Sequence, residues 1–383
     1  MKQKVIYVAY VRLSNSYARD FCVDCLIARG VNVEYWDVVS LVFGEDEHSS
    51  KQTDYLRTPR TYNEIDAMVR LPENKDALYI MMLTYEIRTA KLYKLLSKHD
   101  CRMFSIMWGM MPINSDGKLQ KIFLSLLANP ARFVRTVFNK VVLISYRKLK
   151  LVKPLDVVFA AGEALATGAH YAAKVVPINI VDYDHYVRVK SDADRTVEGR
   201  YAVFLDTYLP YHPDLKILGL PPVDPRQYYL MLNKFFNLLE EKYGIKVVIA
   251  AHPKSDYSVE PFQGREIYRN MTPELARDAD FVISHQSTSL GYAVLNLKPI
   301  IFIYTNEMML LYKDTLSLKE MQGFAQYLNA AIYNIDEITQ GDQIVIDGVD
   351  EKRYEDYKYN FLTTHESEDT TTQEIFWREI NID

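Results

Sequence analysis

The sequence predicts an α/β protein made of two doubly wound parallel sheets, and three observations support this prediction. Short apolar runs alternate with amphipathic helical periods along most of the 383 residues, as in strands joined by crossover helices. Segment 181–200 is rich in charge and poor in aliphatic residues, and it links two stretches with this alternation. Segment 280–304 has the order strand, hydroxyl-rich turn, short helix and strand. We therefore expect two domains of similar size that face a cleft.

The first half alternates β-branched or aromatic runs with helical periods, and Gly30 ends its first helix. The handedness of crossover connections places the helices on both faces of one open sheet. The expected order is strand 4–11, helix 15–29, strand 31–38, loop 45–58, strand 77–84, helix 86–98, strand 103–108, helix 119–128 and strand 156–161.

The second half repeats this architecture, and Gly244 ends its longest helix. The expected order is strand 201–206, helix 225–243, strand 245–251, helix 272–278, strand 281–284, helix 290–297 and strand 299–304, with two amphipathic helices at 351–361 and 372–381. We expect a first domain over 1–185, a second over 186–350, and C-terminal helices in 351–383 that pack back across both.

Composition excludes several classes of function. The net charge of −5 argues against a dedicated nucleic-acid binder. No G-x-G occurs among the 14 glycines, so the dinucleotide-binding fingerprint and the phosphate-binding P-loop are both missing. The eight histidines are scattered without H-x-x-x-H spacing. We therefore expect no metal and no other cofactor.

Cysteine usage and the N-terminus point to an intracellular protein. Cys22 and Cys25 share the apolar stripe of a helix, so we expect buried thiols rather than a redox pair or half of a zinc site. The apolar run 5–11 is followed by Arg12 and lacks a cleavage site, which predicts a first strand and not a signal peptide. No apolar run approaches the roughly 20 residues of a membrane-spanning helix.

Three strands of the second half end in reactive side chains. Because the carboxyl ends of parallel strands share one edge of a sheet, we expect these side chains to face one crevice. They are Asp206, with His212 and Asp214 shortly after it, then His252, Pro253 and Lys254, and finally His285.

Ser287, Thr288 and Ser289 fall at the expected start of helix 290–297. Unpaired backbone N–H groups and the positive end of the helix dipole favour an anion at such a position. A simple N-cap is the alternative, but three hydroxyls beside a histidine exceed what a cap needs. With Ser284 and His285, they form the predicted phosphate site.

Phosphate chemistry needs donors that neutralise charge on a leaving group, and His252, Lys254 and the hydroxyls are suitable donors. A base for an incoming hydroxyl must be a carboxylate or an imidazole within reach. Asp206 is one candidate, and Glu86, just after strand 77–84, is the other. The alternative for Glu86 is a solvated glutamate that complements its helix dipole.

Trp108 and Gly109 follow strand 103–108 and are expected to line the other side of the cleft. A tryptophan there either stacks on a sugar ring or belongs to the core. With His212 and Asp214, these residues are the candidate acceptor-side contacts.

Segment 118–153 contains nine cationic residues and no Asp or Glu, with apolar residues interspersed. Basic charge with apolar anchors is typical of a surface that lies on anionic lipid. The alternative is a solvated helical face whose acids lie elsewhere in the fold. Nucleic acid is a weaker alternative, because the aromatic residues do not form a stacking platform.

The motifs resemble a known family. Ala251-His252-Pro253-Lys254, followed by His285-Gln-Ser287-Thr288-Ser289, resembles the HP and Ser/Ser-Thr motifs of bacterial CMP-sugar-dependent GT-B glycosyltransferases, the sialyltransferases and Kdo transferases. GT-B enzymes have two Rossmann-like domains that face a cleft. The resemblance implies that His252 contacts the leaving phosphate and that the three hydroxyls bind it. It covers roughly the second domain, and the acidic motif that ends in glycine has no clear copy.

The expected function is transfer of a sugar, such as Kdo or a sialic or other nonulosonic acid, from a CMP-linked donor to a glycan or lipid-linked acceptor of a bacterial surface polysaccharide. We expect an enzyme at the cytoplasmic side, peripheral to the inner membrane. The alternatives are a CDP-alcohol polyol-phosphate transferase, a UDP-sugar GT-B enzyme, and a non-catalytic scaffold of envelope assembly.

Overall fold

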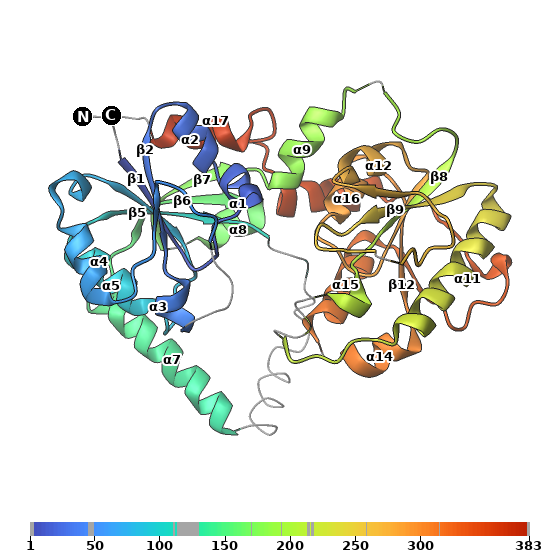
Figure 1. The fold of residues 1–383 in the computed structure, drawn as a ribbon, viewed down its shortest axis with the longest axis horizontal. Helices are drawn as coiled ribbons and strands as arrows, with labels where there is room; N and C mark the ends of the chain where they lie inside the picture. Colours follow the sequence, from blue (N-terminus) through green and yellow to red (C-terminus); the bar gives the residue numbers. More distant parts are fainter. Residues whose placement is uncertain are drawn as a thin grey trace. The chain divides into compact units, whose positions relative to one another are not determined.

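The computed structural model describes residues 4–44, 50–109, 112, 130–169, 171–192, 194–212, 215, 218–257, 259–313 and 315–380. The chain divides into two compact units (Figure 1). Unit 1 comprises Met1–Trp108, Ser115–Ile178 and Glu366–Asp383, and unit 2 comprises Gly109–Asn114 and Asn179–His365. Each unit is a parallel sheet with helices on its faces, which confirms the predicted α/β class with two Rossmann-like domains.

Unit 1 contains a seven-stranded sheet in the order β3-β2-β1-β4-β5-β6-β7, in which every paired strand is parallel to its neighbour. The strands are β1 (Lys4–Ala9), β2 (Asn32–Asp37), β3 (Leu56–Arg57), β4 (Leu78–Met82), β5 (Arg102–Met107), β6 (Leu155–Ala161) and β7 (Ala172–Ile178).

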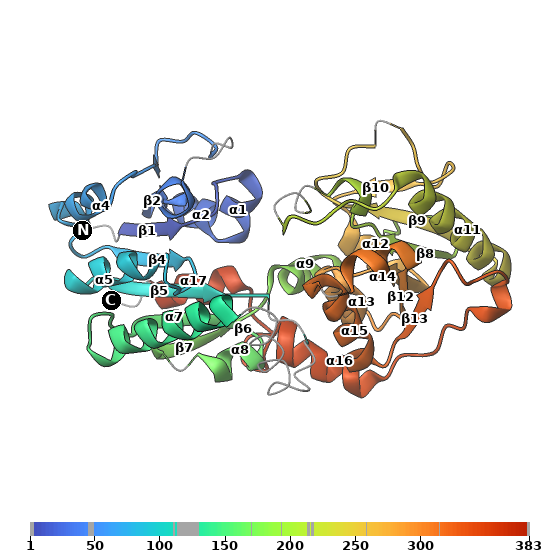
Figure 2. The ribbon, with the colours of Figure 1, turned by 90° about the horizontal axis from the view of Figure 1, so that it is seen from below.

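The helices of unit 1 lie on both faces of this sheet, as Figures 1 and 2 show. Side chains alternate along β1: Ile6 and Val8 belong to the core under α4 and α5, while Tyr7 stacks with Tyr35 on the other face. The helices are α1 (Asn15–Asp20), α2 (Val23–Ala28), α3 (Val39–Phe43), α4 (Tyr62–Val69), α5 (Ala90–Lys98), α7 (Pro130–Lys148), α8 (Glu163–Gly168) and α17 (Thr372–Ile380).

Unit 2 contains a six-stranded parallel sheet in the order β10-β9-β8-β11-β12-β13. The strands are β8 (Tyr201–Leu205), β9 (Lys246–Ala251), β10 (Ile267–Arg269), β11 (Phe281–Ser284), β12 (Ile300–Tyr304) and β13 (Ala331–Asn334). The helices are α9 (Val181–Val189), α11 (Pro225–Tyr243), α12 (Thr272–Asp278), α13 (Leu290–Leu295), α14 (Asn306–Tyr312), α15 (Leu316–Leu328) and α16 (Glu351–Tyr357), and α16 continues as a π-helical turn over Lys358–Leu362.

Three local expectations were wrong. The helix expected at 15–29 is two short helices, because Cys22 adopts a left-handed backbone (φ 63°) between α1 and α2. The helix expected from residue 86 begins at Ala90, since Thr89 accepts the backbone N–H of Glu86 in a preceding turn. Segment 181–200, expected as a linker, contains α9. The helix expected at 119–128 lies outside the described residues.

Cys22 and Cys101 are buried and Cys25 is partly buried, and all three are free thiols. Among the helices that the structure describes, none combines the length and the apolar character needed to cross a membrane.

Candidate functional site

The candidate site lies at the carboxyl edge of the sheet in unit 2. Strand β8 is central, with β9 on one side and β11 on the other, and all three run parallel. Their carboxyl ends therefore share one edge, where doubly wound sheets bind ligands. Adjacent strands are about 4.8 Å apart, so the ends of β9 and β11 are separated by roughly 10 Å across the end of β8.

His252 directly follows β9 and pairs with His212 from the segment after β8. The two imidazole rings pack edge to face with centroids 4.8 Å apart, and both side chains are half-buried. The backbone N–H of Lys254 donates to Nδ1 of His252 over 3.1 Å. Because Nδ1 is an acceptor there, the neutral ring carries its proton on Nε2. The hydrogen-bond donor of the neutral His252 ring is therefore Nε2–H.

The segment that follows His252 is partly fixed by polar contacts. Pro253 and Lys254 are exposed, so the lysine charge lies at the surface of this edge. The hydroxyl of Ser255 donates to the carbonyl of His252 over 2.7 Å, and the guanidinium of Arg269, from the end of β10, donates to the carbonyl of Ser255 over 2.9 Å. These contacts hold the turn that presents the imidazole.

Asp206 lies at the end of β8 and is 5% exposed. Its Oδ1 accepts the backbone N–H of Tyr208 over 2.9 Å, and its Oδ2 accepts the hydroxyl of Tyr257. Burial raises the pKa of this carboxyl to about 6, although the hydrogen bonds from Tyr257 and from the backbone oppose the shift. These contacts tie Asp206 to the loop that carries Tyr257.

Ser287, Thr288 and Ser289 form the turn between β11 and α13, and their exposure ranges from half-buried to exposed. Four backbone N–H groups at this turn and at the start of α13 are already paired within the segment. The N–H of Ser289 donates to Oγ of Ser287, and those of Leu290, Gly291 and Tyr292 donate to the carbonyls of residues 287–289. Helix α13 has only six residues. The side-chain hydroxyls of this turn are therefore its main candidate contacts for an anion.

Ser284 and His285 are enclosed in unit 2, at 0% and 3% exposure, so we remove both from the candidate donor contacts. Nδ1 of His285 lies 2.6 Å from the carbonyl of Ile303, which can only accept, so Nδ1 carries the proton. Nε2 then accepts the hydroxyl of Tyr228 over 2.7 Å. Desolvation lowers the pKa of His285 to about 4, and the ring is neutral.

The remaining candidates lie in other parts of the chain. Glu86, in unit 1, forms an ion pair with Arg88 over 2.9 Å and is partly exposed. Trp108, at the end of β5, packs on Phe21 with ring centroids 4.4 Å apart. Gly109 follows with φ 78° and is exposed. Asp214 lies outside the described residues.

Sequence reasoning missed Tyr257, Tyr228 and Arg269. Tyr257 follows His252 by five residues on the same loop, and that proximity is a usable signal. Tyr228 belongs to the buried face of α11 and is indistinguishable by spacing from core residues. Arg269 ends a three-residue strand that is too short to show a period.

No group of three or more His, Cys, Asp or Glu side chains that could hold a metal ion occurs within the part of the chain that the structure describes. The expectation of chemistry without a metal or other cofactor stays a prediction.

The two parallel-sheet units, with candidate ligand groups at one sheet edge, define the GT-B type of two-domain Rossmann-like fold. No protein-family model and no curated protein matches the sequence. Solved structures do match. The calicheamicin glycosyltransferase CalG4 is 10% identical with a TM-score of 0.54, over 100% of both chains. The wall teichoic acid polymerase TagF is 11% identical with a TM-score of 0.51, over 99% of this chain and 89% of that one. At these identities the likeness concerns the fold.

Proposed function

We propose that the protein is a glycosyltransferase that takes its sugar from a nucleotide-linked donor bound at the carboxyl edge of the unit 2 sheet. One observation carries this proposal. His252, paired with His212, and the charge of Lys254 follow β9, while the hydroxyls of residues 287–289 follow β11 on the other side of β8. These donors flank the position where a phosphate leaving group would bind.

The chemistry of these groups suits a departing phosphate. Nε2–H of His252, the Lys254 ammonium and the hydroxyls donate hydrogen bonds or positive charge to oxygens on which negative charge develops. Asp206, which also accepts the hydroxyl of Tyr257, stays one candidate base. Glu86 stays the other candidate base for the acceptor hydroxyl, with its ion pair to Arg88 setting its orientation.

We place a UDP-linked sugar ahead of the CMP-linked sugar. The residues that carry the resemblance to CMP-sugar enzymes are proposed to address a phosphate, which CMP and UDP donors share. Donors follow β9 and β11, on either side of β8, and a diphosphate presents two phosphate groups to them where CMP presents one. A diphosphate is also present in CDP-alcohols, so transfer of a polyol phosphate is the second candidate. The similarity in fold to TagF, a wall teichoic acid polymerase, is consistent with this second candidate.

Isothermal titration calorimetry with UDP, UMP, CDP, CMP and ADP tests the donor. We expect UDP to bind at least about tenfold more tightly than UMP or CMP, a difference of about 1.4 kcal/mol. His252→Ala and Lys254→Ala should each weaken UDP binding several-fold. Lys234→Ala removes an exposed lysine of α11 in the same unit and should leave binding unchanged.

Preference for CDP would favour the polyol-phosphate candidate, and preference for CMP would restore the CMP-sugar assignment. Binding of none of the five nucleotides would contradict the proposal and favour a non-catalytic scaffold.

We further propose that α7 holds unit 1 on an anionic membrane surface. Val134, Val137, Phe138 and Val141 recur at helical spacing and are 63, 44, 64 and 55% exposed. Arg135 and Lys140 lie in the same helix, and residues 130–153 include no acid. Each cation near an anionic bilayer contributes about 1 kcal/mol of binding free energy. Such a location agrees with a lipid-linked acceptor.

Flotation with vesicles that contain phosphatidylglycerol tests this contact. We expect the parent protein to float, and Arg135→Gln combined with Lys140→Gln and Val137→Ser to reduce the bound fraction about tenfold. Arg226→Gln combined with Lys234→Gln changes two exposed cations of unit 2 and should float like the parent. Equal flotation of all three proteins would contradict a contact through α7.

A further inference from the structure

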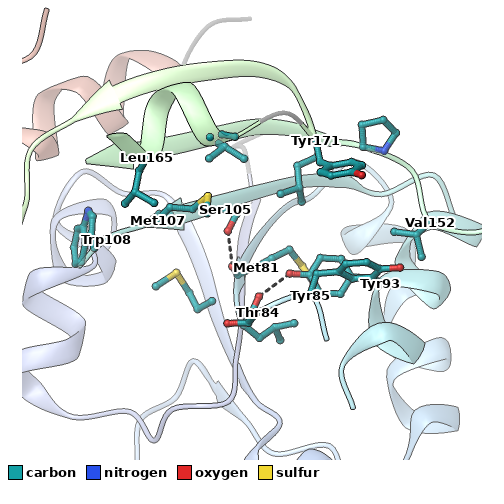
Figure 3. A pocket seen from close by; sticks show the side chains of 18 of the residues that line it. Met81, Thr84, Tyr85, Tyr93, Ser105, Met107, Trp108, Val152, Leu165 and Tyr171 are labelled. Carbon is teal, nitrogen blue, oxygen red and sulfur yellow. Dashed lines mark hydrogen bonds between the residues drawn. The ribbon is translucent and has the colours of Figure 1, made fainter. Parts of the chain in front are cut away.

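Unit 1 contains a cavity of about 830 Å³ over one face of its sheet, bordered by α7 and α8 (Figure 3). The floor is formed by Met81, Ser105 and Val158, which are neighbours in the registers of β4, β5 and β6. Ser105 donates its hydroxyl to the carbonyl of Met81 over 3.1 Å, so this polar group is satisfied within the floor. The volume is in the range of pockets for small organic ligands.

The lining is dominated by apolar and aromatic side chains. Among the described residues that line the cavity, none is Asp or Glu. An apolar wall of this extent favours a hydrocarbon over a sugar, because a sugar hydroxyl that leaves water needs a hydrogen-bond partner. The chain of an amphiphile needs no such partner.

One end of the cavity carries positive charge. The guanidinium of Arg147 lies 3.5 Å from the ring centre of Tyr171 and 4.2 Å from that of Tyr85. Stacking on both rings leaves the N–H groups at the edge of the guanidinium to bind an anion. Arg147 and Lys148 line the cavity, and neither forms an ion pair with an acid of the described residues. Lys153 also lines it, but Asp100 and Asp156 lie 3.1 and 3.5 Å from its ammonium.

The other end is formed by Trp108. Figure 3 shows Trp108 far from Tyr85 and Tyr171, with Met107 and Leu165 beside it. Its indole N–H is buried and has no acceptor within the described part of the chain. The cavity thus runs from a cation stacked on two aromatic rings to the Trp108 ring, whose indole N–H is the polar group at that end.

We propose that this cavity holds the hydrocarbon chain of an anionic membrane lipid, with the phosphate-type head group at Arg147 and Lys148. Charge complementarity selects an anion at that end, and the apolar walls select a chain behind it. Because the cavity adjoins α7, which we propose to contact an anionic membrane, we infer that the amphiphile is a lipid. The helix that contributes Ile144, Arg147 and Lys148 to the cavity also carries the exposed apolar stripe of Val134 and Phe138. The proposal concerns binding and is independent of glycosyl transfer.

Gly168 offers a way to fill the cavity without disturbing the fold. It lines the cavity at the end of α8, and a Cβ added there meets no atom within 4 Å. Its φ lies outside the left-handed range, so a larger residue is tolerated. Gly348, in unit 2, has the same two properties and no place in the cavity lining, which makes Gly348→Leu the matched control.

Calorimetric titration with dodecyl phosphate, below its critical micelle concentration, tests the proposal on the full chain. We expect one molecule to bind per protein, Gly168→Leu to weaken binding at least about tenfold, and Gly348→Leu to match the parent. Arg147→Gln should weaken dodecyl phosphate binding about tenfold while leaving the weaker binding of dodecanol unchanged. Val137→Ser combined with Phe138→Ser should leave the single site intact, which separates the cavity from adhesion to α7.

Three results would overturn the proposal. These are dodecyl phosphate affinity that Gly168→Leu leaves unchanged, equal affinity for dodecanol and dodecyl phosphate in the parent, and inorganic phosphate that binds as tightly as the alkyl phosphate. Because no nucleotide or transferase assay enters the test, its failure is distinguishable from failure of the proposed glycosyl transfer.

Discussion

At the scale of single residues, burial shifts the pKa values of two titratable groups in opposite directions. Asp206 and His285 follow β8 and β11, which are neighbours in the unit 2 sheet. Burial raises the pKa of Asp206 to about 6 and lowers the pKa of His285 to about 4, since the neutral form of each is favoured away from water. Their contributions to the pH dependence of stability therefore have opposite signs and partly cancel in the parent protein.

Asp206→Asn should reveal how much the carboxyl contributes to the pH dependence of stability. Because its folded pKa is raised, its stabilisation is complete below pH 3.8 and is lost as pH rises through about 6. Asparagine avoids that loss and can still accept from Tyr208 N–H. Relative to the parent, we expect the variant to gain on the order of 3 kcal/mol in unfolding free energy between pH 4 and pH 8. Urea unfolding at several pH values measures this, and a constant difference would contradict it.

His285→Gln should reveal the opposite trend. The folded pKa of His285 is depressed, so its stabilisation is complete above pH 6.5 and is lost as pH falls through about 4. The parent protein therefore loses unfolding free energy on acidification, whereas glutamine at this position does not titrate. The same unfolding series should show the variant losing less stability than the parent from pH 7 to pH 4. A variant that follows the parent curve in parallel would show that the imidazole titrates in the folded protein as it does in the unfolded chain.

Residue identity at the strand ends was predictable, but burial was not. The sequence places His252 and His285 alike, each directly after an apolar run. Only the packing of α11 distinguishes them, because Tyr228 from that helix covers His285, whereas the ring of His252 meets His212. Contacts between distant segments decide such differences, and no local pattern records them.

At the scale of elements, local capping signals decided what was predictable. Helix α11 spans the expected residues because Asp224 accepts the N–H of Gln227, Pro225 opens the helix, and Gly244 closes it at φ 60°. The break between α1 and α2 was missed because the left-handed residue there is Cys22, not glycine. Strands β10 and β13 have only three and four residues and exist through pairing with neighbours, so no period revealed them.

Gly244→Ala tests the capping argument. A Cβ at this position has open space, so the cost comes from the left-handed backbone alone. We expect a loss of about 1 to 2 kcal/mol in unfolding free energy. Gly348→Ala, which has open space without a left-handed φ, should change it by about 0.5 kcal/mol or less. Equal effects of the two substitutions in thermal or chemical unfolding would contradict the cap.

At the scale of the whole molecule, the alternation of strands and helices was sufficient to predict the fold class. It was not sufficient to divide the C-terminal segment. Helix α16 belongs to unit 2, whereas α17 belongs to unit 1, where Phe376 packs on Phe159 with centroids 4.7 Å apart and Glu379 pairs with Lys174. Amphipathic periods show that both helices have an apolar face, but they do not show which sheet covers it.

Phe376→Ala should therefore destabilise one unit and spare the other. Phe376 is 1% exposed, and truncation of a buried phenylalanine costs about 3 to 5 kcal/mol. We expect an earlier unfolding transition for unit 1, while UDP titration of unit 2 under native conditions gives the parent affinity. A parallel loss of UDP affinity at a temperature where the variant is folded would contradict this separation.

The return of the chain to its first sheet also bears on synthesis at the ribosome. Residues 179–365 of unit 2 precede residues 366–380 of unit 1 in order of translation. The nascent chain therefore contains all of unit 2 before α17 is synthesised. Co-translational maturation usually proceeds from the N-terminal domain onward. In this protein unit 1 cannot be completed until α17 emerges, and the surface around Phe159 stays uncovered until then.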